Sequence, residues 1–367
     1  MAGLYIHIPF CKSRCIYCGF YSTTLLDLRQ KYVDAICKEM EIKGKGMNIE
    51  TVYLGGGTPS QLTINQLRQL FIYINKVYSL TSTEITIECN PDDVSAEFAA
   101  ALSQFPVNRV SIGVQTFDDE RLRFLHRRHT AKQVPLAVER LRETGIQNIS
   151  IDLMYGFPYE TLDDWRHDID AALALNVEHI SAYCLMIEEG TPLHQWAMVN
   201  GQWSMNEELE RQMYEMLIDR LTAAGYEHYE ISNFAKPGYR SRHNSNYWHD
   251  VPYIGVGAAA HSYDLTSRSW NVADIHQYID AVEKGEIPCE REVLDDDTHY
   301  NDRITVALRT KEGLDLSLLS EMHRNYCLHE AQRFIDDGLL CIIGDHLSLT
   351  RKGLFVSDYI MSSLIYA

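Results

Sequence analysis

The chain has 367 residues, enough for about two domains, and its 46% hydrophobic and 23% charged residues exclude a disordered protein. Its 33 lysines and arginines against 51 aspartates and glutamates give a formal net charge of −18, which argues against a nucleic-acid scaffold. The nine cysteines are an odd number in a long chain, so a disulfide framework is not indicated.

The first half of the chain alternates short apolar runs with amphipathic stretches. Six apolar runs are predicted strands: Leu4–Ile8, a run that ends at Tyr53-Leu54, Glu84–Cys89, Arg109–Val114, Asn148–Tyr155 and His179–Met186. Helical spacing lies between them at Asp27–Ile42, Thr63–Tyr78 and Ala131–Thr144. This alternation predicts parallel βαβ units. Because six units fall short of the eight of a full barrel, we expect an α/β fold built as a partial (β/α)6 TIM-like barrel or an open sheet, with function at the carboxyl ends of the strands.

The second half of the chain has a different pattern. An amphipathic helix is predicted at Asn206–Ala224, whereas residues 240–261 are rich in His, Asn, Gly and aromatic residues and lack a clear period. From about Asn301 the sequence predicts helices, two short strands around the Gly344-Asp345 turn and a helix from Thr350. The predicted organisation is a barrel over 1–200, an extension over 201–300 and a mostly helical, winged-helix-like C-terminal domain over 301–367.

Three of the nine cysteines stand close together as Cys11-Lys-Ser-Arg-Cys15-Ile-Tyr-Cys18, directly after the first predicted strand. A loop with this spacing can bind three irons of a cubane cluster, whereas a ferredoxin site supplies four cysteines. One iron then stays open, and an open position marks a site for a substrate or cofactor. Two alternatives are a structural zinc with His7 or a distant cysteine as fourth ligand, and cysteines without a metal. The other six cysteines are predicted to fill the core: Cys37, Cys89, Cys184, Cys289, Cys327 and Cys341.

Small and polar residues follow the next strands. Gly55-Gly56-Gly57-Thr58 comes after the second strand, where glycines let the backbone approach a ligand closely. Glu88, Gln115 and Asp152 stand at the ends of three successive strands, and Arg127 follows Gln115 along the chain. Each alone is more typical of a turn, a cap or a solvated charge. Polar side chains gathered at one edge of a parallel sheet, however, indicate a binding site.

The cysteine spacing resembles that of the radical S-adenosylmethionine (SAM) superfamily. In that superfamily the amino and carboxylate groups of SAM chelate the open iron of a [4Fe–4S] cluster, and the reduced cluster passes one electron to the sulfonium, which yields methionine and a deoxyadenosyl radical. The resemblance implies a cluster on Cys11, Cys15 and Cys18. It also implies SAM contacts at Tyr5, Tyr17, Gly56, Gly57, Thr58, Glu88, Gln115, Arg127 and Asp152.

The string Tyr5-Ile-His-Ile-Pro-Phe-Cys11 is similar to the branch that holds the oxygen-independent coproporphyrinogen dehydrogenases and the haem chaperones. In the dehydrogenases a further cysteine stands two residues after the third cysteine, whereas this chain has Phe20 at that position. The dehydrogenases also carry an extra segment before the first strand. His243-Asn-Ser-Asn-Tyr-Trp248 matches the HNxxYW motif of the chaperone group. The match implies His243 as a ligand of haem iron, with His261 as a second candidate. The alternative is a packed, hydrogen-bonded histidine.

The resemblance therefore implies a haem chaperone that lacks coproporphyrinogen dehydrogenase activity, binds haem as cargo beside the cluster and SAM, and delivers it to acceptor haemoproteins or respiratory enzymes. Two other functions stay open: a coproporphyrinogen III dehydrogenase that decarboxylates its substrate oxidatively, and a cluster-bearing electron carrier or scaffold without SAM. Expected partners are an electron donor such as flavodoxin or ferredoxin and a second copy of the chain, with membrane contact through the acceptors and no nucleic acid. Because no targeting segment or apolar run of about 18 residues is visible, we expect a cytoplasmic location.

Overall fold

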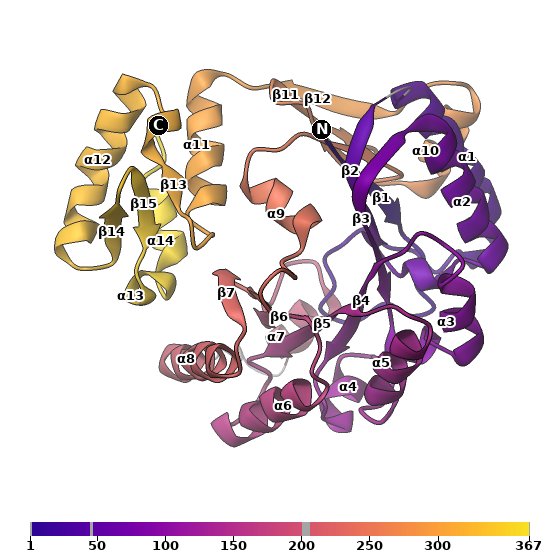
Figure 1. Cartoon of the computed structure of the whole chain (residues 1–367), viewed down its shortest axis with the longest axis horizontal. Coiled ribbons are helices and arrows are strands. Elements are labelled where there is room, and N and C mark those ends of the chain that lie inside the picture. Colours follow the sequence, from indigo (N-terminus) through magenta and orange to yellow (C-terminus); the bar gives the residue numbers. More distant parts are fainter. Residues whose placement is uncertain (1, 45–46, 200–205, 367) are drawn as a thin grey trace.

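Six parallel strands form the centre of the computed structural model, which describes residues 2–44, 47–199 and 206–366. They are β1 (Ala2–Ile8), β2 (Asn48–Gly56), β3 (Ser79–Cys89), β4 (Arg109–Gln115), β5 (Asn148–Tyr155) and β6 (His179–Cys184). Each pairs in parallel with the next along the chain, so their carboxyl ends lie together at one edge of a curved sheet (Figure 1). The predicted run of six parallel strands is confirmed.

Helices between the strands cover the outer face of this sheet (Figure 1). They are α1 (Arg29–Lys43), α2 (Ile64–Val77), α3 (Ala96–Leu102), α4 (Asp119–Phe124), α5 (Gln133–Glu143) and α6 (Leu162–Ala174), with 3-10 turns at Leu26–Leu28, Pro59–Gln61 and Pro91–Asp93. Because side chains alternate along a strand, Leu4, Ile6 and Ile8 of β1 are buried in the main core, whereas Tyr5 and His7 point to the inner face. Burying each of these three aliphatic side chains stabilises the fold by roughly 2 kcal/mol.

The sheet continues on both sides of the parallel strands and has twelve strands among the described residues. Beside β6 lies β8 (Asn233–Ala235), which pairs with it in antiparallel fashion, and beyond β8 lies β7 (Glu227–Glu230), antiparallel to β8. Beside β1 lies β9 (Tyr253–Val256), which pairs in parallel, followed by the antiparallel strands β10 (His261–Tyr263), β11 (Ser267–Asn271) and β12 (Cys289–Val293). The strands of this sheet that follow β6 have only three to five residues. Residues 240–261 show no clear period because they hold a seven-residue helix, the four-residue β9 and the start of β10.

The C-terminal part has a hydrophobic core of its own, built from residues between Tyr300 and Leu364. It contains α11 (Asp296–Ala307), β13 (Leu314–Asp315), a 3-10 turn (Leu316–Leu318), α12 (Glu321–Asp336), β14 (Leu340–Ile343), β15 (His346–Leu349), α13 (Arg351–Leu354) and α14 (Ser357–Ser363). The strands form a small antiparallel sheet with the predicted hairpin at Gly344-Asp345, and the whole follows the predicted winged-helix-like order (Figure 1). The predicted domain boundary at residue 300 falls within α11, and the one at residue 200 lies outside the described residues.

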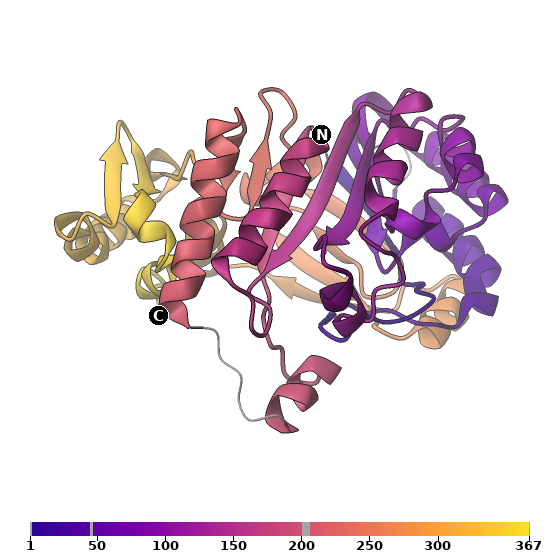
Figure 2. The ribbon, with the colours of Figure 1, turned by 90° about the horizontal axis from the view of Figure 1, so that it is seen from below.

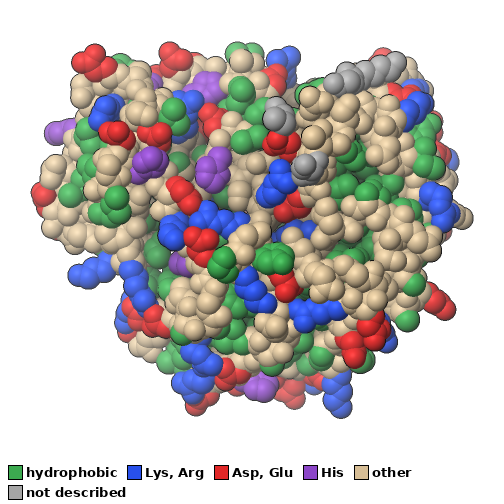
Figure 3. All heavy atoms as spheres, viewed as in Figure 1, with side chains coloured by type: hydrophobic (Ala, Val, Ile, Leu, Met, Phe, Trp, Pro, Cys, Tyr) green, Lys and Arg blue, Asp and Glu red, His purple; other side chains and the backbone are tan. Residues whose placement is uncertain are grey.

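Helix α9 (Arg242–Trp248) lies between the barrel and the C-terminal module (Figure 1) and contacts β2 on one side and α11 on the other. The chain also forms α7 (Pro192–Val199), α8 (Glu207–Ala223) and α10 (Ile275–Glu283), with α8 packed beside α6 (Figure 2). Within the described ranges, no helix combines the length and the apolar character needed to cross a membrane. Acidic, basic and hydrophobic side chains are interspersed on the face shown in Figure 3, so the net negative charge is not gathered there.

Candidate cofactor site

A cavity of about 460 Å³ opens at the carboxyl ends of the parallel strands. The predicted site residues that line it are Cys11, Cys15, Tyr17, Cys18, Gly56, Gly57, Thr58, Glu88, Gln115, Arg127 and Asp152. The structure therefore brings together residues from five successive strands and the loops that follow them. Tyr5 lies one layer behind the lining, with its hydroxyl 3.0 Å from His7 Nδ1 and its ring stacked on Tyr53.

The loop after β1 holds its three cysteines half-buried at this cavity. Its base is closed by two backbone hydrogen bonds with Thr23. Arg127 donates from Nη1 to Sγ of Cys15 at 3.6 Å, so a cation lies directly beside this sulfur. Three sulfurs on one loop beside one cavity are the donor set of a cluster with an open iron, so these residues fit a [4Fe–4S] cluster.

The position of His7 does not favour the alternative of a structural zinc. His7 is buried, and its Nδ1 and Nε2 atoms lie 3.0 Å from the Tyr5 hydroxyl and 2.9 Å from the Tyr21 carbonyl. Burial lowers the pKa of His7 to about 4, so its ring is neutral at pH 7. Both ring nitrogens of His7 are thus hydrogen-bonded inside the protein, so His7 could bind zinc only by breaking one of these hydrogen bonds.

The glycine loop after β2 packs directly against the end of β1. Gly57 N donates to the Ile8 carbonyl at 2.9 Å, and a Cβ on Gly57 would lie 2.6 Å from the Pro9 carbonyl carbon. Gly56 has a φ of +106°, and a Cβ there would lie 2.4 Å from the His7 ring. The two segments can therefore meet only with glycine at both positions, and the bare backbone of the loop lines the cavity.

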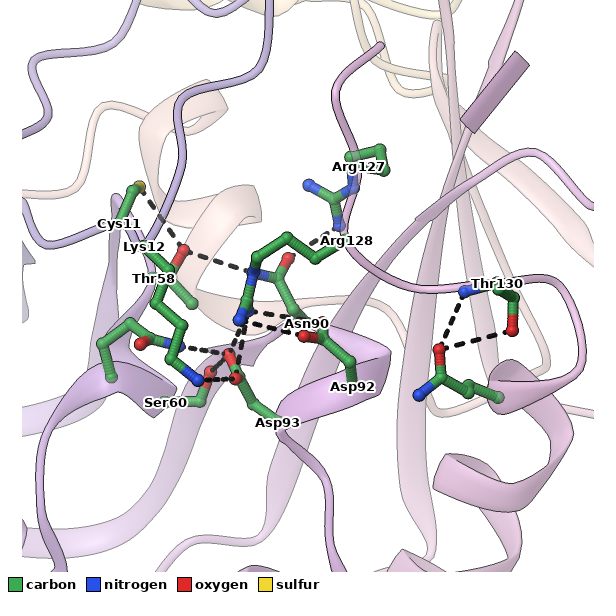
Figure 4. A network of polar contacts seen from close by, with 12 residues as sticks. Cys11, Lys12, Thr58, Ser60, Asn90, Asp92, Asp93, Arg127, Arg128 and Thr130 are labelled. Carbon is green, nitrogen blue, oxygen red and sulfur yellow. Dashed lines mark hydrogen bonds and ion pairs between the residues drawn. The ribbon is translucent and has the colours of Figure 1, made fainter. Parts of the chain in front are cut away.

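A network of polar contacts ties the loops after β1, β2, β3 and β4 together (Figure 4). Cys11 Sγ lies 3.5 Å from Thr58 Oγ1, and Asn90 Nδ2 donates to the same oxygen at 3.4 Å. Arg127 donates from Nη2 to Asn90 Oδ1 at 2.7 Å. Beside them, Arg128 pairs with both aspartates of the turn after β3 at 3.0 Å. The cysteine loop, the glycine loop and the strand ends are therefore held as one unit.

Two half-buried carboxylates, Glu88 and Asp152, face the cavity. Glu88 accepts hydrogen bonds from the Tyr53 hydroxyl at 2.8 Å and from the Gly56 amide at 3.1 Å, and Asp152 accepts one from Ser111 Oγ at 3.4 Å. Burial raises the pKa of Glu88 to about 7 and that of Asp152 to about 6. A carboxylate has about four acceptor positions, so both can also accept hydrogen bonds from hydroxyl or amino groups of a ligand.

Gln115 reaches the cavity through a backbone irregularity at the end of β4. The pairing with β5 shifts in register between Gly113 and Gln115, and Gln115 has a φ of +70°, in the left-handed region that non-glycine residues seldom adopt. Such strain persists only where the surrounding structure enforces it, and it is often found at functional sites. The irregularity thus supports a site role for Gln115.

A glutamine at position 88 is expected to change how the stability of the cluster-free chain depends on pH. Folded Glu88 keeps its proton up to a pKa of about 7, whereas unfolded glutamate ionises near 4.5, so its contribution to stability is lost as pH rises through this window. Between about pH 5 and about pH 8, the free energy of unfolding of the wild type should fall by about 2–3 kcal/mol more than that of Glu88→Gln.

Urea unfolding of both chains at about pH 5 and about pH 8 measures this difference. Buried neutral histidines such as His7 add a slope of opposite sign, because they protonate on unfolding at low pH, but they act equally in both chains. A wild type and variant whose unfolding free energies differ by the same amount at both pH values would contradict a buried, protonated Glu88.

His243 of the HNxxYW motif is buried inside the barrel, only 1% exposed. Its Nδ1 lies 2.8 Å from Thr51 Oγ1, its Nε2 lies 2.9 Å from the Tyr247 hydroxyl, and its ring stacks on Tyr53 with 5.1 Å between centroids. Burial lowers the pKa of His243 to about 3, so the ring is neutral. The next residue, Asn244, lines the cavity instead. This is the arrangement of a packed, hydrogen-bonded histidine, and iron ligation by His243 stays a prediction.

His261 stands exposed at the start of β10, and its ring stacks on Trp270 with 6.1 Å between centroids. Partial burial lowers the pKa of His261 below its ordinary value, which favours the neutral imidazole that binds iron. His261 is therefore the more accessible of the two predicted haem ligands, although it does not line the cavity.

Several lining residues were not predicted from the sequence. Arg109 and Ser111 precede Gln115 at every second position of β4, and Asn90 follows Glu88 at the same spacing. Every second side chain of a strand faces the same side, so counting back from Gln115 in steps of two would have found Ser111 and Arg109. Nothing in the sequence pattern places the α9 residue Asn244 at the cavity, because α9 is brought there by tertiary packing.

Two family models match the chain: the radical SAM superfamily over residues 5–172, and the HemN C-terminal domain over residues 294–356. The solved structure of coproporphyrinogen III oxidase (HemN) from Escherichia coli superposes with a TM-score of 0.84, over 99% of this chain and 90% of that one, at 22% identity. At this identity the superposition shows the fold alone, a partial barrel with a helical C-terminal part.

Relatives named haem chaperone HemW match over most of their length. The protein from Bacillus subtilis is 38% identical over 88% of this chain and 87% of its own. The protein from Mycobacterium tuberculosis is 32% identical over 99% and 94%, and the one from Escherichia coli is 36% identical over 71% and 69%. The chain therefore belongs to the HemW family of the radical SAM superfamily.

Proposed function

We propose that this chain is a haem chaperone that binds haem and passes it to acceptor haemoproteins. The observation that carries the proposal is the 38% identity, over 88% of the chain, to a protein named haem chaperone. The lining of the cavity supports it, because Phe20 and Met186, which are 71% and 66% exposed, line the cavity together with Arg14. An apolar lining that also holds a cation suits a flat apolar macrocycle that carries carboxylates.

Membership of the radical SAM superfamily implies a [4Fe–4S] cluster and SAM. In this proposal Cys11, Cys15 and Cys18 hold the cluster, and SAM contacts the glycine loop, Tyr17, Glu88, Gln115, Arg127 and Asp152. A bound, reduced cluster supplies single electrons to SAM. The protein's own part is to fix the cysteine loop against the sheet through Arg127 and to offer the half-buried acceptors Glu88 and Asp152.

The iron ligand is tested by comparing two variants in a haem titration. His243 can bind iron only if Tyr247 releases its Nε2 atom, whereas His261 is exposed and needs no such change. We expect His243→Ala to shift the Soret band of the bound haem, because His243 adjoins Asn244 at the cavity, whereas His261 does not line it. A shift in His261→Ala alone would show that His261 is the ligand and that haem binds outside the cavity.

The proposed function itself is tested by two assays on reconstituted protein under anaerobic conditions. Haem-loaded protein should transfer haem to an apo-haemoprotein, and incubation with coproporphyrinogen III, SAM and a reductant should yield no protoporphyrinogen. Turnover of coproporphyrinogen would replace the proposal by the dehydrogenase function. Absence of SAM binding would favour the third function, a cluster-bearing electron carrier or scaffold.

The proposal includes partners that follow from this chemistry. Cluster reduction calls for a one-electron donor of the flavodoxin or ferredoxin kind, and haem delivery calls for acceptors such as respiratory enzymes, through which the chain would contact a membrane. A second copy of the chain and a cytoplasmic location belong to the same proposal. Pull-down with the reduced donor tests the contact with the electron donor. Analytical ultracentrifugation of the reconstituted chain tests whether a second copy binds.

A further inference from the structure

The floor of the cavity holds a buried arginine without a partner for most of its donor atoms. Arg109, the first residue of β4, is 1% exposed, and it lines the cavity with Ser111 and Gln115 from the same face of the strand. Its Nε and Nη1 atoms are buried and find no hydrogen-bond acceptor among the described residues. A guanidinium is charged at any physiological pH, so burying it unpaired costs free energy unless an anion completes the site.

Carboxylates on the inner face of the barrel are bound elsewhere. Glu84 accepts hydrogen bonds from two backbone amides at the start of α9. Glu230 pairs with Arg309 of the C-terminal module at 2.9 Å. Glu88 and Asp152 have the partners described above. None of these four carboxylates forms an ion pair with Arg109 in the described ranges.

The two imidazoles near Arg109 do not supply an anion either. His179 is buried, with Nδ1 2.8 Å from Ser150 Oγ and Nε2 2.8 Å from the Tyr229 hydroxyl. Burial, helped by the charge of Arg109, lowers the pKa of both His179 and His243, so both rings are neutral. Nε and Nη1 of Arg109 therefore have no hydrogen-bonded anion at the floor of a cavity that is open to ligands, and the guanidinium acts on Glu88 and Asp152 through space.

We propose that Arg109 binds a carboxylate of the ligand that enters this cavity, namely a propionate side chain of a porphyrin. This inference rests on the proposed haem function. The guanidinium presents a planar fork of donors that matches a carboxylate with two parallel hydrogen bonds. From Arg109 to Gln115, β4 spans about 20 Å, so a ligand anchored at the floor extends toward the residues assigned to SAM. Asn244 of the HNxxYW motif lines the same cavity and faces this ligand.

The test uses metal-free protoporphyrin IX and its dimethyl ester, because without iron no histidine ligation contributes to binding. Wild-type protein should bind the free acid roughly ten- to hundredfold more tightly than the ester. Arg109→Met should remove this preference and leave the affinity for the ester unchanged. The control is Arg140→Gln, which removes a half-buried arginine that donates to the Val94 carbonyl outside the cavity and should keep the preference.

Two further measurements separate a ligand-binding arginine from one that braces the fold or binds SAM. Urea unfolding of the ligand-free chains should show Arg109→Met as stable as the wild type or more so, because a buried unpaired charge is removed. SAM affinity measured by equilibrium dialysis should be the same in both chains. A strongly destabilised variant, or one that loses SAM affinity, would overturn the proposal.

The outcomes also distinguish this inference from the proposed function. Equal binding of acid and ester to the wild type, or an acid preference retained in Arg109→Met, would overturn the role of Arg109 and leave haem binding intact. Binding of neither porphyrin would overturn this inference, whereas the proposed function is overturned only if haem itself does not bind.

Discussion

Serine in place of Cys15 is expected to abolish binding of the [4Fe–4S] cluster almost completely. The motif supplies only three thiolates to the cavity, so each loss leaves two, and a serine oxygen is a poor ligand for iron in such clusters. Cys15 is also the sulfur that receives the Arg127 hydrogen bond at 3.6 Å. Iron and sulfide content after anaerobic reconstitution, together with the visible absorption of the cluster, measures the effect.

The cavity itself offers matched controls for this experiment. Cys184 and Cys89 line the same cavity but lie on strands and outside the motif loop. Cys184→Ser and Cys89→Ser should therefore keep the cluster. Cluster loss in either of them, with a cluster retained in Cys15→Ser, would show that the ligands are wrongly assigned.

Asparagine in place of Asp152 is expected to weaken SAM binding by roughly ten- to hundredfold, the usual effect of losing hydrogen bonds to a charged group. Asp152 is half-buried on β5, faces the cavity and accepts a hydrogen bond from Ser111. Asparagine keeps the size of the side chain, but it replaces one acceptor oxygen by an NH2 group. That group cannot accept a hydrogen bond from a hydroxyl or amino group of the ligand. Isothermal titration of SAM into reconstituted protein gives the affinity.

Two controls accompany the Asp152 experiment. Iron content should equal that of the wild type, since Asp152 is not a cluster ligand in this proposal. Glu227→Gln, which removes a carboxylate paired with Arg240 and Lys311 away from the cavity, should leave SAM affinity unchanged. An Asp152→Asn chain that binds SAM like the wild type would remove this residue from the SAM site.

The centre of the site could be predicted from the sequence because it follows local rules. Parallel strands in chain order bring their carboxyl ends to one edge, so Glu88, Gln115 and Asp152 had to meet once each was placed at a strand end. The cysteine loop and the glycine loop directly follow β1 and β2, which are paired strands. Tyr5 was assigned to the SAM contacts by resemblance alone, and the structure places it one layer behind the lining.

Other parts of the site depend on contacts between distant segments and carry no local signal. β9 adds to β1 although some 250 residues separate them, and its four residues are too few to show a period. Helix α9 enters the barrel because Glu84 caps its first amides, a contact that no spacing reveals. The HNxxYW pattern gives the identity of His243, but only the structure shows that Thr51 and Tyr247 engage both of its ring nitrogens.

Titration of haem into the anaerobically reconstituted chain, followed by absorption, tests most directly whether this protein carries haem. We expect saturable binding of haem with a shifted Soret band, and a complex that gives up its haem to an apo-haemoprotein. A spectrum that stays that of free haem throughout the titration would contradict the proposed function.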